Sequence, residues 1–299
     1  MKHIKIDNIL ECLTPENPLP VIIDSPHSGK IYPNDFNYAC DLNQLRRIED
    51  KYVDDLFSES PNARAILLTA LFPRSYIDVN RAIDDIDHTL IEGDWPNDTH
   101  GYTNPTSRSD SGIGLIARLI RPGMPIYNRP LCADEIMNRI KTYYEPYHDT
   151  LCTILDQTYY DFGQFWHINC HSMPSSSAYP KRQLSMIGAT PRPSDIVLGD
   201  MDGNTSTREF TRALRDFWKN KGYRVTVNDP FKGVELVNRY SQPTRGKNSI
   251  QIEINRALYM NEKTGAQNKD YNVIKGHCTE MVQMCTAFAQ SHLTKIAAD

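Results

Sequence analysis

The chain of 299 residues carries 33 Lys and Arg against 37 Asp and Glu, so its formal net charge is −4. This acidic balance argues against general binding to nucleic-acid phosphates or anionic membranes, although it permits a local basic pocket for a small anion. A hydrophobic content of 39% and a charged content of 23% are typical of a folded globular protein and argue against a disordered chain.

The seven cysteines have no regular spacing and form no Cys-x-x-Cys pair, which is typical of reduced thiols. We therefore expect a cytoplasmic protein without a disulfide framework or a cysteine zinc site. Acidic residues interrupt the apolar N-terminus, so a signal peptide is a poor interpretation, and no stretch approaches about 18 apolar residues. The expected partner is a small molecule, not nucleic acid or a membrane, and the oligomeric state is left open.

In the first third of the chain, the predicted strands end in polar residues. The hydrophobic pattern predicts strands at 21–24, 63–70 and 75–79, and a helix at 41–60. Pro26 ends the first strand directly before His27, and the third strand leads into Asn80 and Arg81. Sheet ends are where α/β proteins place their chemistry, so these three residues are candidates for a site.

The middle of the chain predicts long loops, a helix and a second strand that ends in a histidine. Residues 84–130 are rich in Asp, Gly, Pro and Ser, and long loops of this kind in compact domains are usually functional. Residues 133–162 predict a helix that Pro146 kinks or splits. The strand that follows ends at His171, which repeats the arrangement seen at His27.

The last third alternates strands and helices. It predicts a loop at 175–193, a strand at 196–198, a helix with a capping box at 206–209, a strand at 223–227, a loop at 232–247, a strand at 249–256 and a terminal helix at 272–297. Glu253 lies on the face of its strand opposite the isoleucines. The alternation favours one α/β domain over residues 1–299, with a central mixed, largely parallel sheet flanked by helices.

The two strand-end histidines suggest a metal site. Two histidines and one carboxylate from the helix after His27 could bind Zn²⁺ and leave a position open for water. Zinc lowers the pKa of such a water toward ~7, and a carboxylate that does not bind the metal can take its proton. Glu253 is the natural candidate for this base. His167 and Cys170 lie inside the same strand as His171 and are interpreted as packed residues.

Five short motifs, taken in order, resemble the N-formylglutamate amidohydrolase family. They are Pro26-His27-Ser28-Gly29, Asp50-x-x-Val53-Asp54-x-Leu56-Phe57, Asp78-Val79-Asn80-Arg81, Asn169-Cys170-His171-Ser172-Met173 and Glu253-Ile254-Asn255-Arg256. The resemblance runs from about Pro20 to Arg256. It implies a phosphorylase/hydrolase-like fold similar to that of zinc carboxypeptidases.

The resemblance also implies roles for individual residues. His27, Asp50 and His171 would bind the metal, Glu253 would be the base, and Asn80 with Arg81 would hold a substrate carboxylate. The zinc carboxypeptidase pattern has a Glu three residues after the first His, where this chain has Lys30. On a helical wheel Glu49 falls on the apolar face and Asp50 does not, so Glu49 stays an alternative ligand. Asp54 could instead orient a ligating histidine.

A guanidinium grips a carboxylate with two parallel hydrogen bonds, and an acylated glutamate offers two carboxylates. Arg81 together with one of Arg74, Arg108 or Arg245 would suit such a substrate. The leading hypothesis is therefore zinc-dependent hydrolysis of an N-acyl acidic amino acid, N-formyl-L-glutamate first among them. The alternatives are a related zinc carboxypeptidase or deacylase, and a non-catalytic binding protein of the same fold.

Overall fold

One mixed sheet organises the computed structural model, which describes residues 1–181 and 192–296. Its strand order is β1-β2-β4-β3-β7-β10-β8-β9. The strands are β1 (Lys2–Ile6), β2 (Leu10–Thr14), β3 (Val21–Ser25), β4 (Ile66–Ala70), β7 (Phe165–Met173), β8 (Ile196–Gly199), β9 (Val225–Val227) and β10 (Lys247–Asn255). The central strands β4, β3, β7 and β10 are parallel, whereas β10 pairs with β8, and β2 with both β1 and β4, in antiparallel fashion. The predicted α/β class with a mixed, largely parallel sheet is confirmed.

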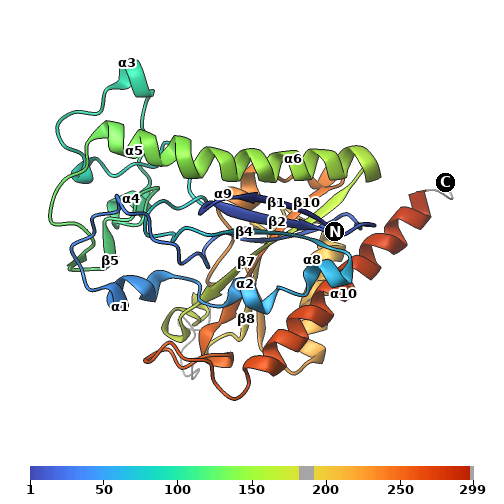
Figure 1. Ribbon diagram of the computed structural model, residues 1–299. Coiled ribbons are helices and arrows are strands. Elements are labelled where there is room, and N and C mark those ends of the chain that lie inside the picture. The colour runs from blue at the N-terminus through green and yellow to red at the C-terminus, as the bar shows by residue number, and fades with distance from the viewer. Residues whose placement is uncertain (182–191, 297–299) are drawn as a thin grey trace.

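Helices cover both faces of this sheet (Figure 1). The helices are α1 (Leu42–Leu45), α2 (Val53–Leu56), α3 (Asn97–His100), α4 (Ser107–Asp110), α5 (Ala133–Arg139), α6 (Glu145–Phe162), α8 (Arg208–Asn220), α9 (Glu235–Arg239) and α10 (Tyr271–Ile296). The long α6 lies across one face, and α10 and α8 lie across the other. A small hairpin of β5 (Leu119–Arg121) and β6 (Met124–Pro125) stands apart from the main sheet.

Successive residues of a strand point to opposite faces, and here the two faces differ in polarity. Val21, Ile168 and Ile252 pack with residues of α10 and α8 in one hydrophobic cluster. Their neighbours on the α6 side include polar and titratable residues on three adjacent strands: Asp24, His167, Asn169, His171, Ser249, Gln251 and Glu253. The predicted placement of Glu253 opposite the isoleucines is therefore confirmed, and His167 is buried as expected.

The long helix in the middle of the chain divides near Pro146, as predicted. A π-helical turn at Ile140–Tyr144 separates α5 from α6, and Pro146 lies in the first turn of α6. A proline is tolerated there because the first N–H groups of a helix have no intrahelical partner. The chain changes its helical geometry just before the proline and continues for the length of α6.

Several other predicted elements differ from the structure. Residues 75–79 form turns and not a strand: their apolar side chains belong to the hydrophobic cluster that includes residues of α5 and α6, and the Asp78 carboxylate accepts the Asn80 N–H at 2.9 Å, closing a turn. The predicted loop at 232–247 contains α9. The cap of α8 is Thr207 and not Ser206, because the Thr207 side chain accepts from a backbone N–H of the first turn.

Among residues 1–181 and 192–296, no helix is long and apolar enough to cross a membrane. The predicted loop at 175–193 and the end of the predicted helix at 272–297 lie partly outside the described residues. The organisation of residues 1–299 as a single domain stays a prediction, which the single large sheet supports.

Candidate active site

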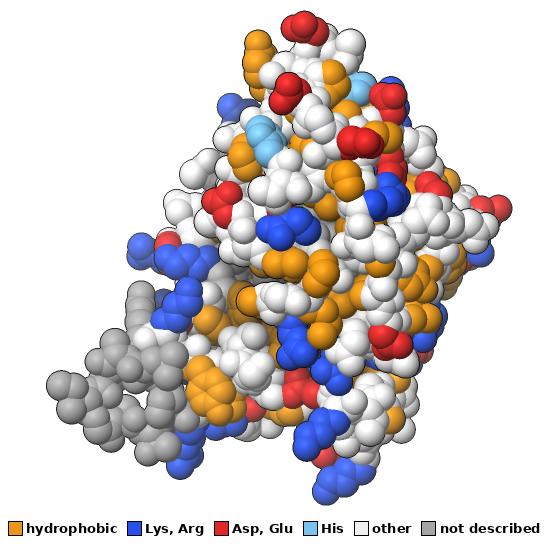
Figure 2. Space-filling view, turned by 90° about the vertical axis from the view of Figure 1, so that its left-hand side faces the viewer, with side chains coloured by type: hydrophobic (Ala, Val, Ile, Leu, Met, Phe, Trp, Pro, Cys, Tyr) orange, Lys and Arg blue, Asp and Glu red, His pale blue; other side chains and the backbone are white. Residues whose placement is uncertain are grey.

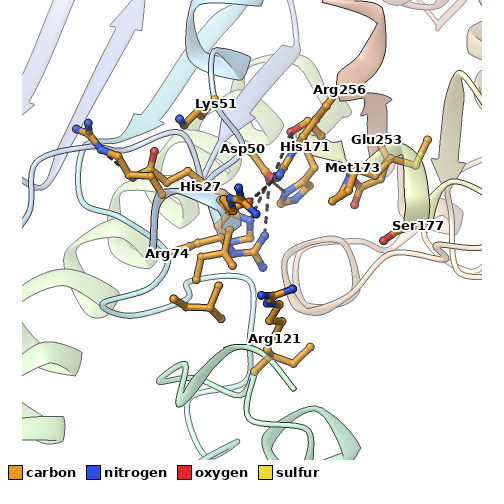
Figure 3. Close-up of a pocket in the computed structure, with 18 of the residues that line it drawn as sticks. His27, Asp50, Lys51, Arg74, Arg121, His171, Met173, Ser177, Glu253 and Arg256 are labelled. Atoms are coloured by element: carbon orange, nitrogen blue, oxygen red, sulfur yellow. Dashed lines mark hydrogen bonds and ion pairs between the residues drawn. The ribbon is translucent and has the colours of Figure 1, made fainter. Parts of the chain in front are cut away.

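Three side chains that could bind a metal ion meet near the carboxyl ends of β3 and β7 (Figure 3). His27 follows β3, His171 lies near the end of β7, and Asp50 comes from the segment between α1 and α2. Asp50 Oδ2 is 3.0 Å from His171 Nδ1 and 3.4 Å from His27 Nδ1. One ligand atom of each residue lies within 4.8 Å of the other two, and all three residues are buried. The structure therefore brings together the three residues named as ligands from the sequence.

The far nitrogens of both imidazole rings have oxygen partners. His27 Nε2 lies 2.7 Å from Asp78 Oδ1, and His171 Nε2 lies 2.6 Å from Asn169 Oδ1. On the near side, His27 Nδ1 is buried and makes no hydrogen bond within the described part of the chain. Metal-binding histidines commonly turn one nitrogen to the ion and donate the other N–H to an oxygen. The donor set thus fits a divalent ion on the Nδ1 side of both rings.

Asp50 reaches the histidines because residues 41–60 do not form one helix. The helical turns after α1 end at Glu49, whose ψ of 146° is extended, and Tyr52 has a left-handed φ of 69° before α2 begins. The Asp50 N–H donates to the His27 carbonyl at 3.0 Å, a bond that replaces an intrahelical one. The prediction of a continuous helix is wrong, and the helical-wheel argument for Glu49 no longer applies.

Glu49 has partners of its own. The Tyr32 hydroxyl donates to Glu49 Oε1, and Arg46 Nε lies 3.9 Å from the same oxygen. Burial raises the pKa of Glu49. The geometry therefore supports Asp50 and not Glu49 as the acidic ligand.

Cations and hydrogen-bond donors surround the buried Asp50 carboxylate. Arg256 Nη2 lies 2.8 Å from Asp50 Oδ1, and Arg74 Nη1 lies 3.8 Å from Oδ2. Burial by itself would raise the pKa of Asp50, but the adjacent His171 and His27 side chains and the charges of both arginines hold this pKa well below its usual range. Asp50 is therefore ionised at neutral pH, as a metal ligand must be.

Glu253 lies beside His171, because the two residues are Cα partners in the parallel pairing of β10 with β7. Its side chain is buried, and this burial raises the pKa of Glu253 to about 7, an effect that the negative charge of Asp50 reinforces. Gln251 Nε2 donates to Glu253 Oε1 at 2.8 Å. A carboxylate whose pKa is near neutrality can take up a proton in one step and return it in another.

The cluster opens into a cavity of about 900 Å³ whose charged lining is mostly basic. Its basic residues are Arg46, Arg47, Lys51, Arg74, Arg81, Arg108, Arg121, Arg256 and Lys263, and its acidic residues are Glu49, Asp50, Asp78, Glu253 and Glu262. On the side of the molecule shown in Figure 2, Lys and Arg side chains lie across the middle and lower parts, whereas acidic side chains gather toward the upper end. Such a cavity favours an acidic ligand although the whole chain is acidic.

Four of the five residues predicted to bind substrate line this cavity, namely Asn80, Arg74, Arg81 and Arg108. Arg245 does not. It is exposed in the short 3-10 helix Pro243–Arg245 before β10, and it lies at the opposite end of that strand from Glu253. Because β10 is extended along its whole length, a residue before its first position cannot share a pocket with one near its last.

Arg81 and Asn80 occupy different electrostatic positions. Burial lowers the pKa of Arg81 to about 10, and the like charges of Arg74 and Arg108 contribute to this lowering. The negative charge of Asp78 raises the pKa and so offsets only part of the shift. The Asn80 amide is already bonded: its Oδ1 accepts the Leu236 N–H at 2.9 Å, and its Nδ2 lies 3.3 Å from Asn169 Oδ1. Arg81 Nε and Nη1 donate to the carbonyls of Ile113 and Asn80, so Nη2, which lies 3.7 Å from Asp78 Oδ2, is the part of Arg81 left for a ligand, whereas the whole Asn80 amide is held by the protein.

The sequence prediction gave no role to four residues that the structure brings to the site. Asp78, Asn169 and Arg256 contact the cluster of His27, Asp50 and His171, and each lies within one of the five motifs, so the motifs themselves were the available signal. Arg121 lines the cavity from the β5–β6 hairpin. Its place in the predicted loops at 84–130 carries no sequence signal that separates it from a solvated surface arginine.

A family model described as N-formylglutamate amidohydrolase matches residues 19–260. Two curated relatives, the N-formylglutamate deformylases of Pseudomonas putida and Pseudomonas aeruginosa, are each 24% identical to the chain. The first alignment covers 82% of this chain and 83% of the relative, and the second covers 82% and 84%.

Two solved structures are similar over nearly the whole chain. The N-formylglutamate amidohydrolase from Ralstonia eutropha JMP134 has a TM-score of 0.88 and 38% identity, and the match covers 95% of this chain and 99% of that one. A gene product from Agrobacterium tumefaciens has a TM-score of 0.64 at 17% identity, with 96% of each chain covered. The second likeness shows a shared fold alone.

Proposed function

The chain belongs to the N-formylglutamate amidohydrolase family, and we propose that it hydrolyses N-formyl-L-glutamate to formate and L-glutamate. The family establishes a hydrolytic enzyme that acts on an amide. The observation that carries the proposal for this chain is the meeting of His27, Asp50 and His171 with Glu253 at the base of a cavity with a basic lining.

The donor set fits a resident metal ion, which we propose is Zn²⁺. His27 Nδ1, Asp50 Oδ2 and His171 Nδ1 would hold it, and the buried, unbonded His27 Nδ1 is the observation that supports a missing partner. Two imidazoles and one carboxylate are a ligand set of catalytic zinc sites. When bound, such an ion polarises an acyl oxygen and makes a neighbouring water more acidic.

Glu253 is proposed as the general base and acid. Its carboxylate takes a proton from the attacking water while the water oxygen bonds to the formyl carbon, and it then gives this proton to the amine nitrogen as the carbon–nitrogen bond breaks. Burial supports this role, because a pKa of about 7 suits both acceptance and return of a proton near neutral pH. The hydrogen bond from Gln251 fixes the position of the carboxylate.

The two carboxylates of the substrate are proposed to meet Arg81, Arg108 and Arg121. Arg81 Nη2 has only the Asp78 carboxylate nearby, at 3.7 Å, and the Arg108 and Arg121 side chains form no hydrogen bond or ion pair with other described residues. In Figure 3, Arg121 reaches from its hairpin toward the cluster of His27, Asp50 and His171. Guanidinium groups around the cavity would hold the acidic substrate so that the formyl carbon faces the water.

A substrate panel tests the proposal. Purified protein with one equivalent of Zn²⁺ should release formate from N-formyl-L-glutamate far faster than from N-formyl-L-leucine, and it should not cleave short peptides. Removal of the metal with a chelator should abolish turnover, and added Zn²⁺ should restore it. Preferential cleavage of peptides would instead support a zinc carboxypeptidase, and full activity after metal removal would contradict the metal site.

A further inference from the structure

A layer of buried polar side chains lies beneath the metal-binding cluster, and the proposed reaction does not use it directly. Asp24, His167 and Asn169 are fully buried on the α6 side of β3 and β7. Asp24 and Asn169 are Cα partners across these two strands. Buried polar groups are costly unless they are bonded, so the partners of this layer need an explanation.

The hydrogen bonds fix the orientation of the Asn169 amide. Its Nδ2 lies 2.9 Å from Asp24 Oδ2, and an amide NH₂ group facing a carboxylate oxygen must be the donor. Its Oδ1 therefore faces the other way, where Asn80 Nδ2 lies 3.3 Å away. The Asn80 amide is oriented independently, because its Oδ1 accepts the backbone N–H of Leu236. Both neighbours thus require the same orientation of Asn169.

This orientation decides where the proton of His171 resides. His171 Nε2 lies 2.6 Å from Asn169 Oδ1, which can only accept, so Nε2 must carry the hydrogen. In the neutral ring Nδ1 is then the lone-pair nitrogen, and Nδ1 is the atom beside Asp50 Oδ2. Asn80 Nδ2, which is 3.1 Å from His171 Nε2, is a second donor to Asn169 and not a partner of the imidazole.

We propose that Asp24 and Asn169 form a buried positioning pair that holds the His171 proton on Nε2 and keeps Nδ1 available for the metal ion. Asp24 orients Asn169, and Asn169 orients His171, so the effect passes from β3 to the ligand on β7. The proposal rests on the proposed metal site. The simpler alternative is that Asp24 only ties α6 to the sheet, since the Tyr147 hydroxyl on α6 also donates to its carboxylate.

Zinc affinity separates the two interpretations. Asn169→Leu keeps the approximate shape but removes the acceptor of His171, and it should weaken Zn²⁺ binding about 10- to 100-fold, as changes of outer-shell partners typically do. Tyr147→Phe is the matched control, because it removes the tie to α6 and leaves the path from Asp24 to His171 intact. It should lower the melting temperature of the metal-free protein and leave zinc affinity unchanged. Competition with a chromophoric chelator measures both affinities.

If Asn169→Leu does not fold, exchanging Asp24 and Asn169 for each other provides a second test. Asn169→Asp alone places two carboxylates side by side and should weaken zinc binding. Adding Asp24→Asn restores a donor opposite the carboxylate, and the double variant should regain an affinity close to that of the wild type. An exchanged pair that binds zinc no better than Asn169→Asp would overturn the proposal, as would a folded Asn169→Leu protein with wild-type affinity.

The metal-free wild type gives a readout that depends on neither zinc nor turnover. Nitrogen-15 chemical shifts of labelled histidine should show His171 with its hydrogen on Nε2. A ring with its hydrogen on Nδ1 alone and none on Nε2 would contradict the positioning pair, whatever the enzyme hydrolyses. Wild-type protein with the Nε2 tautomer but without zinc binding would contradict the proposed metal site and leave the tautomer assignment standing.

Discussion

Two groups of arginines in the same cavity meet very different surroundings. Arg74 and Arg256 lie deep in the site and contact the carboxylates of Asp50 and Asp78. Arg108 in α4 and Arg121 at the end of β5 also line the cavity, but they make no ion pair within the described part of the chain. The deep guanidinium groups therefore neutralise buried charge, whereas the outer groups leave their charge to a ligand. Position in the cavity, and not residue type, therefore distinguishes the arginines that neutralise buried carboxylates from those proposed to bind the substrate.

The first prediction concerns Glu253, the proposed general base. Glu253→Gln removes the proton acceptor and preserves the shape of the side chain, so kcat should fall about 10²- to 10⁴-fold. Bound zinc should stay at the wild-type level, because Glu253 is not a proposed ligand. Steady-state kinetics and metal analysis on the same sample measure both quantities.

Glu262→Gln is the control for this change, because Glu262 is another carboxylate of the cavity lining and accepts a hydrogen bond from the Ser175 N–H at 2.9 Å. It should retain most of the activity. A Glu253→Gln enzyme that turned over at the wild-type rate would remove Glu253 from the mechanism.

The second prediction tests whether the deep arginines are supporting residues. Arg256→Met leaves the fully buried Asp50 with one cationic neighbour fewer, and loss of one partner of a buried pair costs about 3–5 kcal/mol of unfolding free energy. Urea denaturation of the metal-free protein measures the loss. Arg256→Lys retains the charge and should be less damaging. Unchanged stability in Arg256→Met would mean that the deep and outer arginines are equivalent.

The third prediction concerns the pH dependence of stability that arises from His148, which contacts the turn that carries Arg81. His148 Nε2 lies 2.9 Å from the Val79 carbonyl, in the turn that carries Arg81. Burial, helped by the charge of Arg239, lowers the pKa of His148 to about 4. Between this value and about 6.5 the unfolded chain binds a proton and the folded chain does not, so stability falls as the pH drops through this window, by on the order of 3 kcal/mol.

His148→Gln has no titrating ring, and this variant should show a correspondingly flatter loss of stability between pH 6.5 and 4. Chemical denaturation at several pH values measures the difference between the two proteins. If the two proteins lost stability in parallel as the pH fell, His148 would be protonated equally in the folded and unfolded states. It would then not act as an uncharged support for the turn.

The last prediction has the smallest expected effect and tests the outer arginines. Arg121→Gln should raise KM for N-formyl-L-glutamate about 10-fold, because one charge-assisted hydrogen bond is lost, and it should leave KM for N-formyl-L-glutamine nearly unchanged. Arg121 is exposed, so stability should change by less than about 0.5 kcal/mol. Arg212→Gln, on the exposed side of α8, removes the same charge away from the cavity and should preserve both KM values. If the preference for glutamate survived in Arg121→Gln, another cation would have to bind the second carboxylate.

Sequence and structure agree best where hydrophobic alternation and strand ends decide the position of a residue. His171 and Glu253 occur in strands with clear patterns, and parallel pairing of those strands brings the two side chains together. The segment that carries Asp50 was predicted less well, because its apolar spacing fits a helix although bonds to the His27 loop break it. Arg245 was misplaced for a related reason: the sequence shows that it precedes a strand, but not which end of the sheet forms the cavity.

The α/β class, the family and most of the residues that build the site can be predicted from the sequence. These follow from local periodicity and from short motifs, which are properties of neighbouring positions. Three relations appear first in the folded chain: the choice of Asp50 as the carboxylate that faces the histidines, the ion pairs of the deep arginines, and the contact of Asp24 with Asn169 beneath His171. Those relations join strands and loops far apart in the chain, and their energies depend on burial and distance, which a linear pattern does not contain.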